Sequence, residues 1–331
     1  MAREHSRTID LPLNPPPTVP HRNSTSALRI SAFLRRERWR ALKGECNSPN
    51  DPGSNFSQAN LGSDSVDSVI GEVFEGDLAL TNIRGKSKVS LESRNGSITI
   101  ANRIERWAHT SLKAAGAVTI GDAIGQHSIV EIVAGGDVTI GQAIGENSQV
   151  TITSTGGKIT IGLNAVTAIK ATLPEESTVL TGRGVHQHSI VILTAPGDVT
   201  INGSIDQQVT ADIISINGAI SIERIETAVA LLTAGTTVHI SGKIGEHSEL
   251  TILAQDDVIV GETIEQHAAI QLASLSGSIL IGQGLHRGAT AMLTAVNGTV
   301  NIGGHVNEGA FVEWNARQFN GPAKAAPPDY K

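Results

Sequence analysis

The stretch Gly136-Asp-Val-Thr-Ile-Gly-Gln-Ala-Ile-Gly-Glu-Asn-Ser-Gln-Val-Thr-Ile-Thr-Ser-Thr-Gly156 decides the fold, because similar copies recur about twelve times between Gly76 and Gln318. Successive copies begin at residues 76, 96, 116, 136, 157, 177, 197, 218, 236, 256, 277 and 298, at intervals of 18 to 21 residues. A unit this short cannot bury its own apolar face, so the copies must stack on one another.

Each copy alternates apolar and polar residues in two short runs that are rich in β-branched side chains, which is typical of strands. In the quoted copy, alternation directs one set inward: Val138, Ile140, Ile144, Val150 and Ile152. The set expected to face water is Thr139, Gln142, Glu146, Gln149 and Thr151. The pattern predicts an all-β, single-stranded parallel β-helix of about 12 coils of 20–21 residues, forming a rod of about 55 to 60 Å.

Composition agrees with a narrow interior built from small side chains. Aromatic residues make up 3% of the 331 residues and there are two methionines. The single cysteine, Cys46, excludes an intramolecular disulfide framework. No apolar run approaches the about 18 residues that span a membrane, and no Sec-type signal peptide is recognised, which leaves the localisation open between the cytoplasm and a specialised secretion system.

The rest of the chain is divided by composition into flanking segments. Residues 1–25 are expected to be a disordered Pro-rich leader, residues 26–44 a basic amphipathic helix, and residues 45–75 a linker with an imperfect first coil or cap. The solenoid is assigned to 76–318 and a disordered tail to 319–331. Phe74 and Trp314, which falls on the inward column of Ile152, are expected to plug the two ends of the core.

Charge is unevenly divided between the arm and the rod. Residues 1–44 carry nine basic and three acidic groups, a balance of +6, which leaves −13 for the remainder of a chain of net charge −7. The basic helix is compatible with a cap on the first coil, with a membrane-surface or nucleic-acid contact, or with a leader for export. The acidic overall balance argues against nucleic acid as a partner.

Departures from the repeat are where a binding site is expected. The fifth unit loses the pattern after Ile161 and ends in Pro174-Glu175-Glu176, and the eighth unit is two residues short after Ile222. A surface loop and a tightened corner are the structural interpretations, and either irregularity would also shape a groove. Charged residues near the first departure are the candidates for polymer binding: Glu175, Glu176, Arg183 and His186.

Histidines recur at one position of a turn, shared with Asn147, Gln208, Gly288 and Gly309. Because these residue types tolerate positive φ, the column of His127, His188, His247 and His267 predicts a left-handed turn position. The alternative is a metal or proton site formed by His247 and His267 on adjacent coils. Two ligands make a weak site, and we expect no bound metal or other cofactor.

Acidic residues also recur, in the column after the glycine that opens each unit, but neighbouring coils never both supply one: the acids are Asp77, Asp137, Asp198 and Asp257. This column therefore forms neither a catalytic carboxylate pair nor a row of carboxylates that could bind calcium ions along successive coils. No nucleophile elbow, phosphate loop or zinc spacing is found in the sequence, so no catalytic residue is assigned.

One outward row is regular enough to contact a ligand. Four consecutive units place a threonine at the same outward position: Thr99, Thr119, Thr139 and Thr160. Such hydroxyls can bind a repetitive polymer, although threonine is also simply a favourable outward strand residue.

Strings such as Gly-Asp-Val-Thr-Ile at a 20-residue period resemble the β-helical repeats of filamentous-haemagglutinin-like bacterial adhesins over residues 76–318. They look less like bactofilins, which are also small parallel solenoids. The resemblance implies the fold and a secreted, adhesin-like protein.

Three functions are compatible with these observations. The first is a non-enzymatic binding or scaffolding protein, which contacts a protein or polysaccharide through its polar faces and can self-associate through its ends. The second is a β-helical carbohydrate-active enzyme, a lyase or hydrolase, with chemistry near Glu175, Glu176, Arg183 and His186. The third is a secreted bacterial effector or toxin with an N-terminal export leader.

Overall fold

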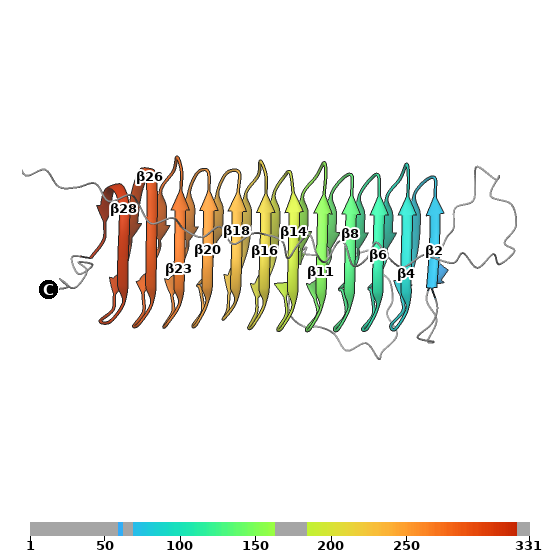
Figure 1. Ribbon diagram of the computed structural model, residues 1–331, viewed down its shortest axis with the longest axis horizontal. Coiled ribbons are helices and arrows are strands. Elements are labelled where there is room, and N and C mark those ends of the chain that lie inside the picture. Colours follow the sequence, from blue (N-terminus) through green and yellow to red (C-terminus); the bar gives the residue numbers. More distant parts are fainter. Residues whose placement is uncertain (1–58, 62–68, 163–183, 323–331) are drawn as a thin grey trace, which may run out of the picture. The chain divides into compact units, whose positions relative to one another are not determined.

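The computed structural model describes residues 59–61, 69–162 and 184–322, and these residues wind into a parallel β-solenoid of about eleven turns (Figure 1). The predicted fold class is therefore confirmed. No helix occurs in the described residues. The predicted leader, the predicted helix over 26–44 and residues 323–331 of the predicted tail lie outside the described part of the chain.

One side of the solenoid, here called the long-strand face, is a sheet of twelve parallel strands, mostly of six residues (Figure 1). In order along the chain they are β2 (Val69–Phe74), β4 (Lys88–Ser93), β6 (His109–Ala114), β8 (Ile129–Ala134), β11 (Gln149–Ser154), β14 (Ile190–Ala195), β16 (Thr210–Ser215), β18 (Val229–Ala234), β20 (Glu249–Ala254), β23 (Ala269–Ser274), β26 (Thr290–Ile302) and β28 (Phe311–Asn320).

A second side, the short-strand face, carries the Val-Thr-Ile runs that follow each long strand. Its strands are β3 (Leu78–Ile83), β5 (Ile98–Ile100), β7 (Val118–Ile120), β9 (Val138–Ile140), β12 (Ile159–Ile161), β15 (Val199–Ile205), β17 (Ile220–Ile225), β19 (Val238–Ile240), β21 (Val258–Val260) and β24 (Ile279–Ile281). β1 (Ala59–Leu61) pairs with β3 before the first coil, and the second halves of β26 and β28 continue this face at the other end.

The third side, the corner face, is held by the lone apolar residue that follows each short strand. Its strands have two residues: β10 (Ala143–Ile144), β13 (Gly184–Val185), β22 (Thr263–Ile264), β25 (Gly284–Leu285) and β27 (His305–Val306). Elsewhere on this side single bridges join Ile83, Ile104, Ile124 and Ile144 in series. Each coil is thus a three-sided ring whose sides pair with the same sides of the next coil.

The core consists of columns of aliphatic side chains, as alternation predicts. Ile140 is fully buried and pairs in register with Ile120 on one side and Ile161 on the other. All five residues predicted to point inward from the quoted copy are at most 1% exposed. Parallel pairing at about 4.8 Å brings these aliphatic groups into contact from coil to coil, so burial and pairing reinforce each other.

The structure has about eleven turns and not the twelve that the sequence units predict, because the fifth and sixth units, which begin at residues 157 and 177, form a single turn. Ile159–Ile161 pairs with Val138–Ile140 before it and with Val199–Ile201 after it, so no coil intervenes. In the preceding coil a single residue, Gln142, separates Gly141 from Ala143; here residues 163–183 stand between Gly162 and Gly184. The fifth and sixth units together therefore form one coil, in which residues 163–183 are an insertion.

The last coil shows how the described core ends. Trp314 pairs in register with Leu293 of the inward column, as predicted, but its side chain is 42% exposed rather than buried. Within the described residues no coil follows β28, and the Trp314 ring stacks on Phe319 at a centroid distance of 4.8 Å. Phe319 and, at the first coils, Phe74 are partly buried against the core.

Candidate functional site

The threonine row lies on the short-strand face and is longer than the sequence count indicates. Thr99, Thr119, Thr139 and Thr160 occupy the middle of successive strands and pair in register. Because residues 163–183 are an insertion, the next member is Thr200, followed by Ser221. The row therefore spans six coils, or about 24 Å at the usual strand spacing.

The hydroxyls of this row are not used to hold the fold together. Within the described residues, none of the five threonines makes a side-chain hydrogen bond, whereas Ser148 and Ser189, which are fully buried, donate to the carbonyl oxygens of Gly125 and Gly145 at 3.0 and 2.9 Å. Thr99, Thr119, Thr139 and Thr200 are partly exposed, so their hydroxyls are available to water or to a ligand. Thr160 is only 7% exposed, so this member of the predicted row is largely withdrawn from the surface. The arrangement suits a partner with regularly spaced polar groups.

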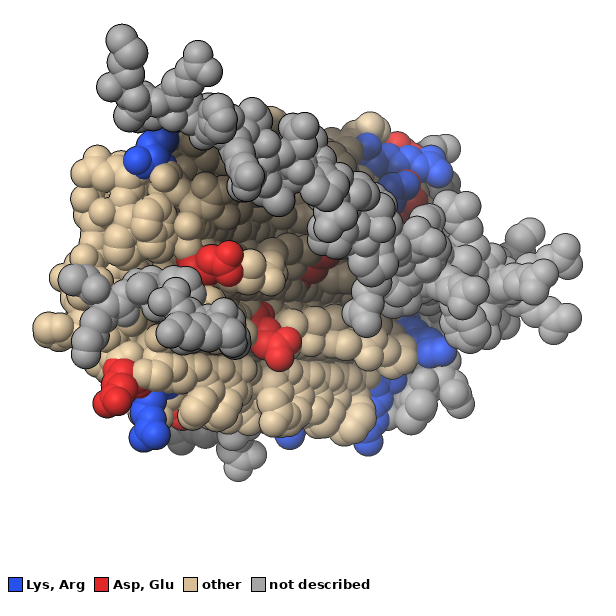
Figure 2. All heavy atoms as spheres, turned by 60° about the vertical axis from the view of Figure 1, so that its left-hand side comes forward, with Lys and Arg blue, Asp and Glu red and all other residues tan. Residues whose placement is uncertain are grey.

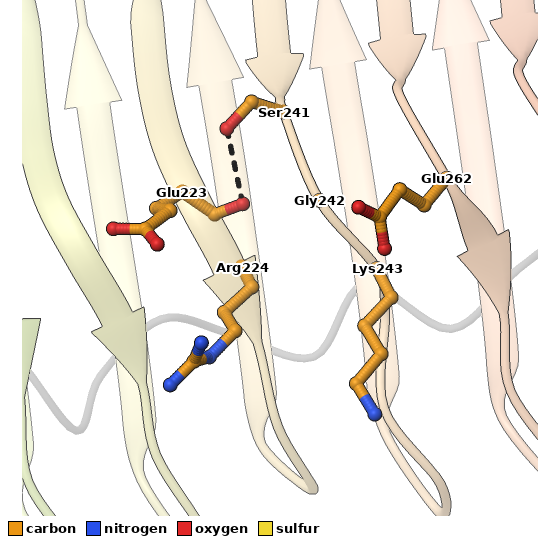
Figure 3. A pocket seen from close by; sticks show the side chains of 6 residues that line it. All are labelled: Glu223, Arg224, Ser241, Gly242, Lys243 and Glu262. Atoms are coloured by element: carbon orange, nitrogen blue, oxygen red, sulfur yellow. Dashed lines mark hydrogen bonds between the residues drawn. The ribbon is translucent and has the colours of Figure 1, made fainter.

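The row ends beside a shallow depression of about 330 Å³ on the corner face (Figure 3). It is lined by Glu223, Arg224, Ser241, Gly242, Lys243 and Glu262. Figure 3 shows these residues on neighbouring coils, with the Ser241 hydroxyl donating to the Glu223 carbonyl oxygen at 3.2 Å. Ser221, the last member of the row, lies two residues before Glu223 on β17.

The depression has a cause in the sequence, since it coincides with the shortened eighth unit. Between Ile222 and Ile225 the chain has two residues where the next coil has three, between Ile240 and Ile244. Both residues of this shortened turn, Glu223 and Arg224, line the depression. The shortened eighth unit therefore forms a tight turn and also borders a depression, so both of its predicted interpretations apply.

Charges of both signs surround the depression. The Arg224 Nε lies 2.9 Å from Glu226 Oε1, so this guanidinium is already paired. Lys243, Glu223 and Glu262 make no ion pair with any described residue. The walls can therefore contact a polar partner, but they lack the enclosed, mostly apolar lining of a small-molecule pocket.

The corner face also holds a histidine–carboxylate pair that the sequence analysis missed. His186 Nδ1 donates to Asp206 Oδ2 at 2.7 Å from the preceding coil, and the Ser204 hydroxyl donates to the other oxygen of Asp206. Burial opposes ionisation of Asp206, but the hydrogen bonds from His186 and Ser204 and the nearby charges of His186 and Arg224 lower its pKa overall. The carboxylate is thus held as an anion by its neighbours.

A second pair of the same kind lies four coils further along. His286 Nδ1 is 3.0 Å from Glu265 Oε2, and Thr263 donates to the other oxygen of Glu265 at 2.8 Å. Both pairs join residues that directly follow the lone apolar residue of adjacent coils. A search for His and acid at a spacing of about 20 residues in one column would have found them.

The candidate residues therefore divide into three groups. Thr99, Thr119, Thr139 and Thr160 are brought into one row. His186 lies on the corner face, where it is hydrogen-bonded to Asp206, whereas the threonine row lies on the short-strand face. Glu175, Glu176 and Arg183 lie outside the described residues.

The aspartates that open the units have a structural role. Oδ1 of each accepts a hydrogen bond from a backbone N–H of the next coil: Asp77 from Ser97, Asp137 from Lys158, Asp198 from Ala219 and Asp257 from Ser278, at 2.7 to 3.0 Å. Where Ser97 takes the acid's position, its hydroxyl oxygen accepts from the N–H of Ala117 at 3.1 Å. These side chains bridge coils instead of meeting one another.

The histidine column adopts the predicted left-handed turn. His127, His188, His247 and His267 have φ between 56° and 59°, in line with Asn147 and Gln208. The rings of His247 and His267 stack at a centroid distance of 5.3 Å. Across the described ranges, no group of three or more His, Cys, Asp and Glu side chains is arranged to hold a metal ion.

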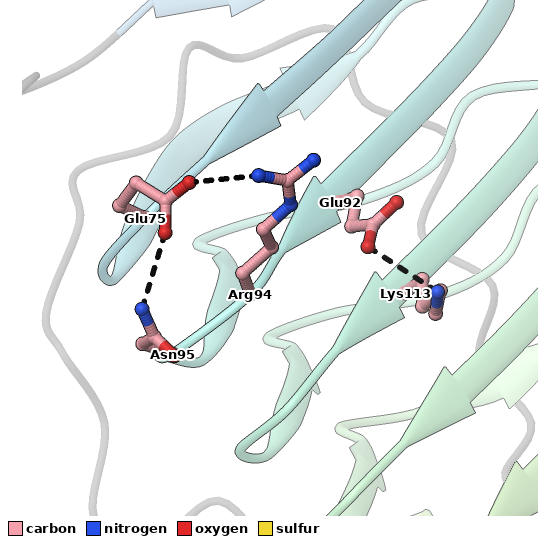
Figure 4. A network of polar contacts seen from close by, with 5 residues as sticks. All are labelled: Glu75, Glu92, Arg94, Asn95 and Lys113. Carbon is pink, nitrogen blue, oxygen red and sulfur yellow. Dashed lines mark hydrogen bonds and ion pairs between the residues drawn. The ribbon is translucent and has the colours of Figure 1, made fainter.

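The described surface that is visible in Figure 2 is sparsely charged, with a few separate acidic and basic side chains among uncharged residues. On the first coils of the long-strand face the acids are paired across strands: Glu75 with Arg94 at 3.1 Å, and Glu92 with Lys113 at 3.2 Å (Figure 4). In the part of the chain that is described, no helix has the length and apolarity to cross a membrane.

No family model, no curated protein and no solved structure matches this chain. The functional argument therefore depends on the solenoid and its side chains.

Proposed function

We propose that this protein is a non-enzymatic, adhesin-like binding scaffold that contacts a polysaccharide through the short-strand face. The observation that carries this proposal is the row of threonines, whose hydroxyls stand in register without partners in the described structure. A polymer lying along the solenoid would meet an equivalent hydroxyl at every coil, so weak contacts would add along its length.

The depression extends this polar surface past the end of the row. Lys243 and Glu262 would supply one cationic and one anionic contact beyond Ser221. The opening aspartates support a non-enzymatic role, because each accepts a hydrogen bond from a backbone N–H of the next coil and no two of them form a carboxylate pair.

A binding assay with a panel of immobilised neutral and anionic polysaccharides tests the proposal. The variant Thr119→Val/Thr139→Val keeps the β-branched shape and removes two hydroxyls from the centre of the row. We expect it to lose most of the binding shown by the wild type. The matched control is Thr151→Val, an exposed threonine on the long-strand face of the same coil as Thr139.

The same panel separates binding from catalysis. Release of reducing ends or of unsaturated sugar products by the wild-type protein would show an enzyme and refute the proposal. Equal binding by the wild type and by Thr119→Val/Thr139→Val would refute the role of the row.

A further inference from the structure

The long-strand face carries an apolar patch with one carboxylate at its centre. The patch, here called the Asp212 patch, consists of Ile190, Ile192, Asp212, Ile214, Ile216, Val229 and Leu231 on β14, β16, β18 and the turn after β16. Several of its apolar side chains are strongly exposed for their type: Ile190 46%, Ile216 56%, Val229 50% and Leu231 43%. Exposed aliphatic groups gathered in this way mark an interaction surface more often than scattered ones do.

Register places Asp212 between two apolar neighbours. Ile192 and Leu231 flank it on the adjacent strands. The eight nearest outward positions of the sheet are all uncharged: Ile190, Ile192, Thr194, Thr210, Ile214, Val229, Leu231 and Thr233. The carboxylate therefore has no cation beside it on its own face.

The side chain of Asp212 makes no hydrogen bond or ion pair with a described residue. Its Oδ1 is buried and hydrogen-bonds to none of the described residues. Burial also raises the pKa of this carboxyl above its ordinary range, because the surrounding aliphatic groups exclude water from it. On the same face Glu92 and Glu75 have basic partners, and Glu131, which has no ion pair with a described residue, is exposed. Asp212 differs from these acids because its Oδ1 is buried without a described partner.

We propose that the Asp212 patch is a docking surface for a protein partner that places one arginine or lysine side chain between apolar side chains. Charge complementarity selects this occupant: a cation would pair with the carboxylate, and aliphatic neighbours of that cation would cover Ile192, Ile214 and Leu231. A partner lacking the cation would leave the carboxylate desolvated and unpaired, which is costly.

A second copy of this chain fits the patch less well. Two copies meeting through the centre of the patch would bring two Asp212 carboxylates together, and like charges in an apolar setting repel each other. The proposal does not depend on the threonine row, which lies on a different face.

Methyl NMR of the full-length protein, labelled at isoleucine and leucine, tests the inference. The probes are an acetylated pentapeptide with arginine between two isoleucines and its counterpart with glutamine in place of arginine. We expect saturable shifts of the Ile192, Ile214 and Leu231 methyl signals, with about fivefold tighter binding of the arginine peptide. Asp212→Asn should abolish this difference, and Glu131→Gln, an exposed acid in the same outward position three strands earlier, should preserve it.

Three results would overturn the proposal. The first is equal affinity for the two peptides, or no saturable shift at these methyls. The second is an arginine preference that survives Asp212→Asn. The third is a shift of the same signals with protein concentration alone, which would show that a second copy occupies the patch.

Discussion

Replacing Ile140 by alanine tests the column packing at its centre. Ile140 is fully buried and stacks between Ile120 and Ile161. Loss of three carbons from a site of this kind costs about 2 to 5 kcal/mol, because the cavity adds to the lost transfer free energy. In a solenoid each coil contacts only its neighbours, so this cost should fall on the adjacent coils.

Hydrogen–deuterium exchange measured by mass spectrometry resolves where the loss falls. A local cost of about 3 kcal/mol raises the open population about a hundredfold, so amides of β7, β9 and β12 should exchange about a hundredfold faster. Amides of β21 and β24 should keep their wild-type protection. The more severe change Ile140→Asp buries an unpaired charge and should unfold the neighbouring coils.

Thr139→Ala is the matched control, since this residue precedes Ile140 on the same strand and points outward. We expect it to cost less than about 1 kcal/mol. Equal losses for Thr139→Ala and Ile140→Ala, or a loss spread evenly from β4 to β26, would refute the assignment of inward and outward columns.

Four further predictions concern the left-handed turn, the cross-coil bridges and two titrating carboxyl groups. His247→Asn should leave the melting temperature nearly unchanged, whereas His247→Val should lower the free energy of unfolding by about 1 to 2 kcal/mol, since a β-branched residue resists the φ of +56°. Asp257→Ala should cost about 0.5 to 1.5 kcal/mol through loss of its 2.7 Å bond from the Ser278 N–H; no change in chemical denaturation would contradict the bridging role. Because burial raises the pKa of Asp212, folding favours its protonated form, so its contribution to stability should improve as pH falls through that pKa, and Asp212→Asn should be stabilising at neutral pH. The pKa shift of Asp206 has the opposite sign. Because its pKa is lowered in the folded state, the ionised carboxylate contributes to the free energy of unfolding at neutral pH, and this contribution is lost as pH falls through the folded-state pKa. Thermal unfolding of Asp206→Asn between pH 2 and 7 should lack that loss.

Much of the fold follows from local rules that repeat at every coil. Alternation predicts that Val138 and Ile140 are buried, and tolerance of positive φ predicts the turn at His127 and His267. Both depend only on residues close together in sequence, so they can be inferred without knowledge of the register.

Features that depend on register were harder to predict. Counting in steps of about 20 residues treats 157–196 as two units, whereas pairing of Thr160 with Thr200 makes them one coil. The bond from His186 to Asp206 and the apolar surroundings of Asp212 likewise join residues on neighbouring coils, and they appear only once each coil is correctly placed. The exposure of Trp314 reflects the end of the stack, which no repeat pattern encodes.

Continuity of the threonine row across the insertion is the central claim, and disulfide formation in a Cys46→Ser background tests it directly. The account predicts that Thr160→Cys/Thr200→Cys is oxidised readily, because these positions are paired neighbours on adjacent strands within the reach of a disulfide. In the register obtained by counting units, Thr160 would instead face residue 180. A disulfide in Thr160→Cys/Leu180→Cys, with none in Thr160→Cys/Thr200→Cys, would contradict the eleven-turn solenoid and the row built on it.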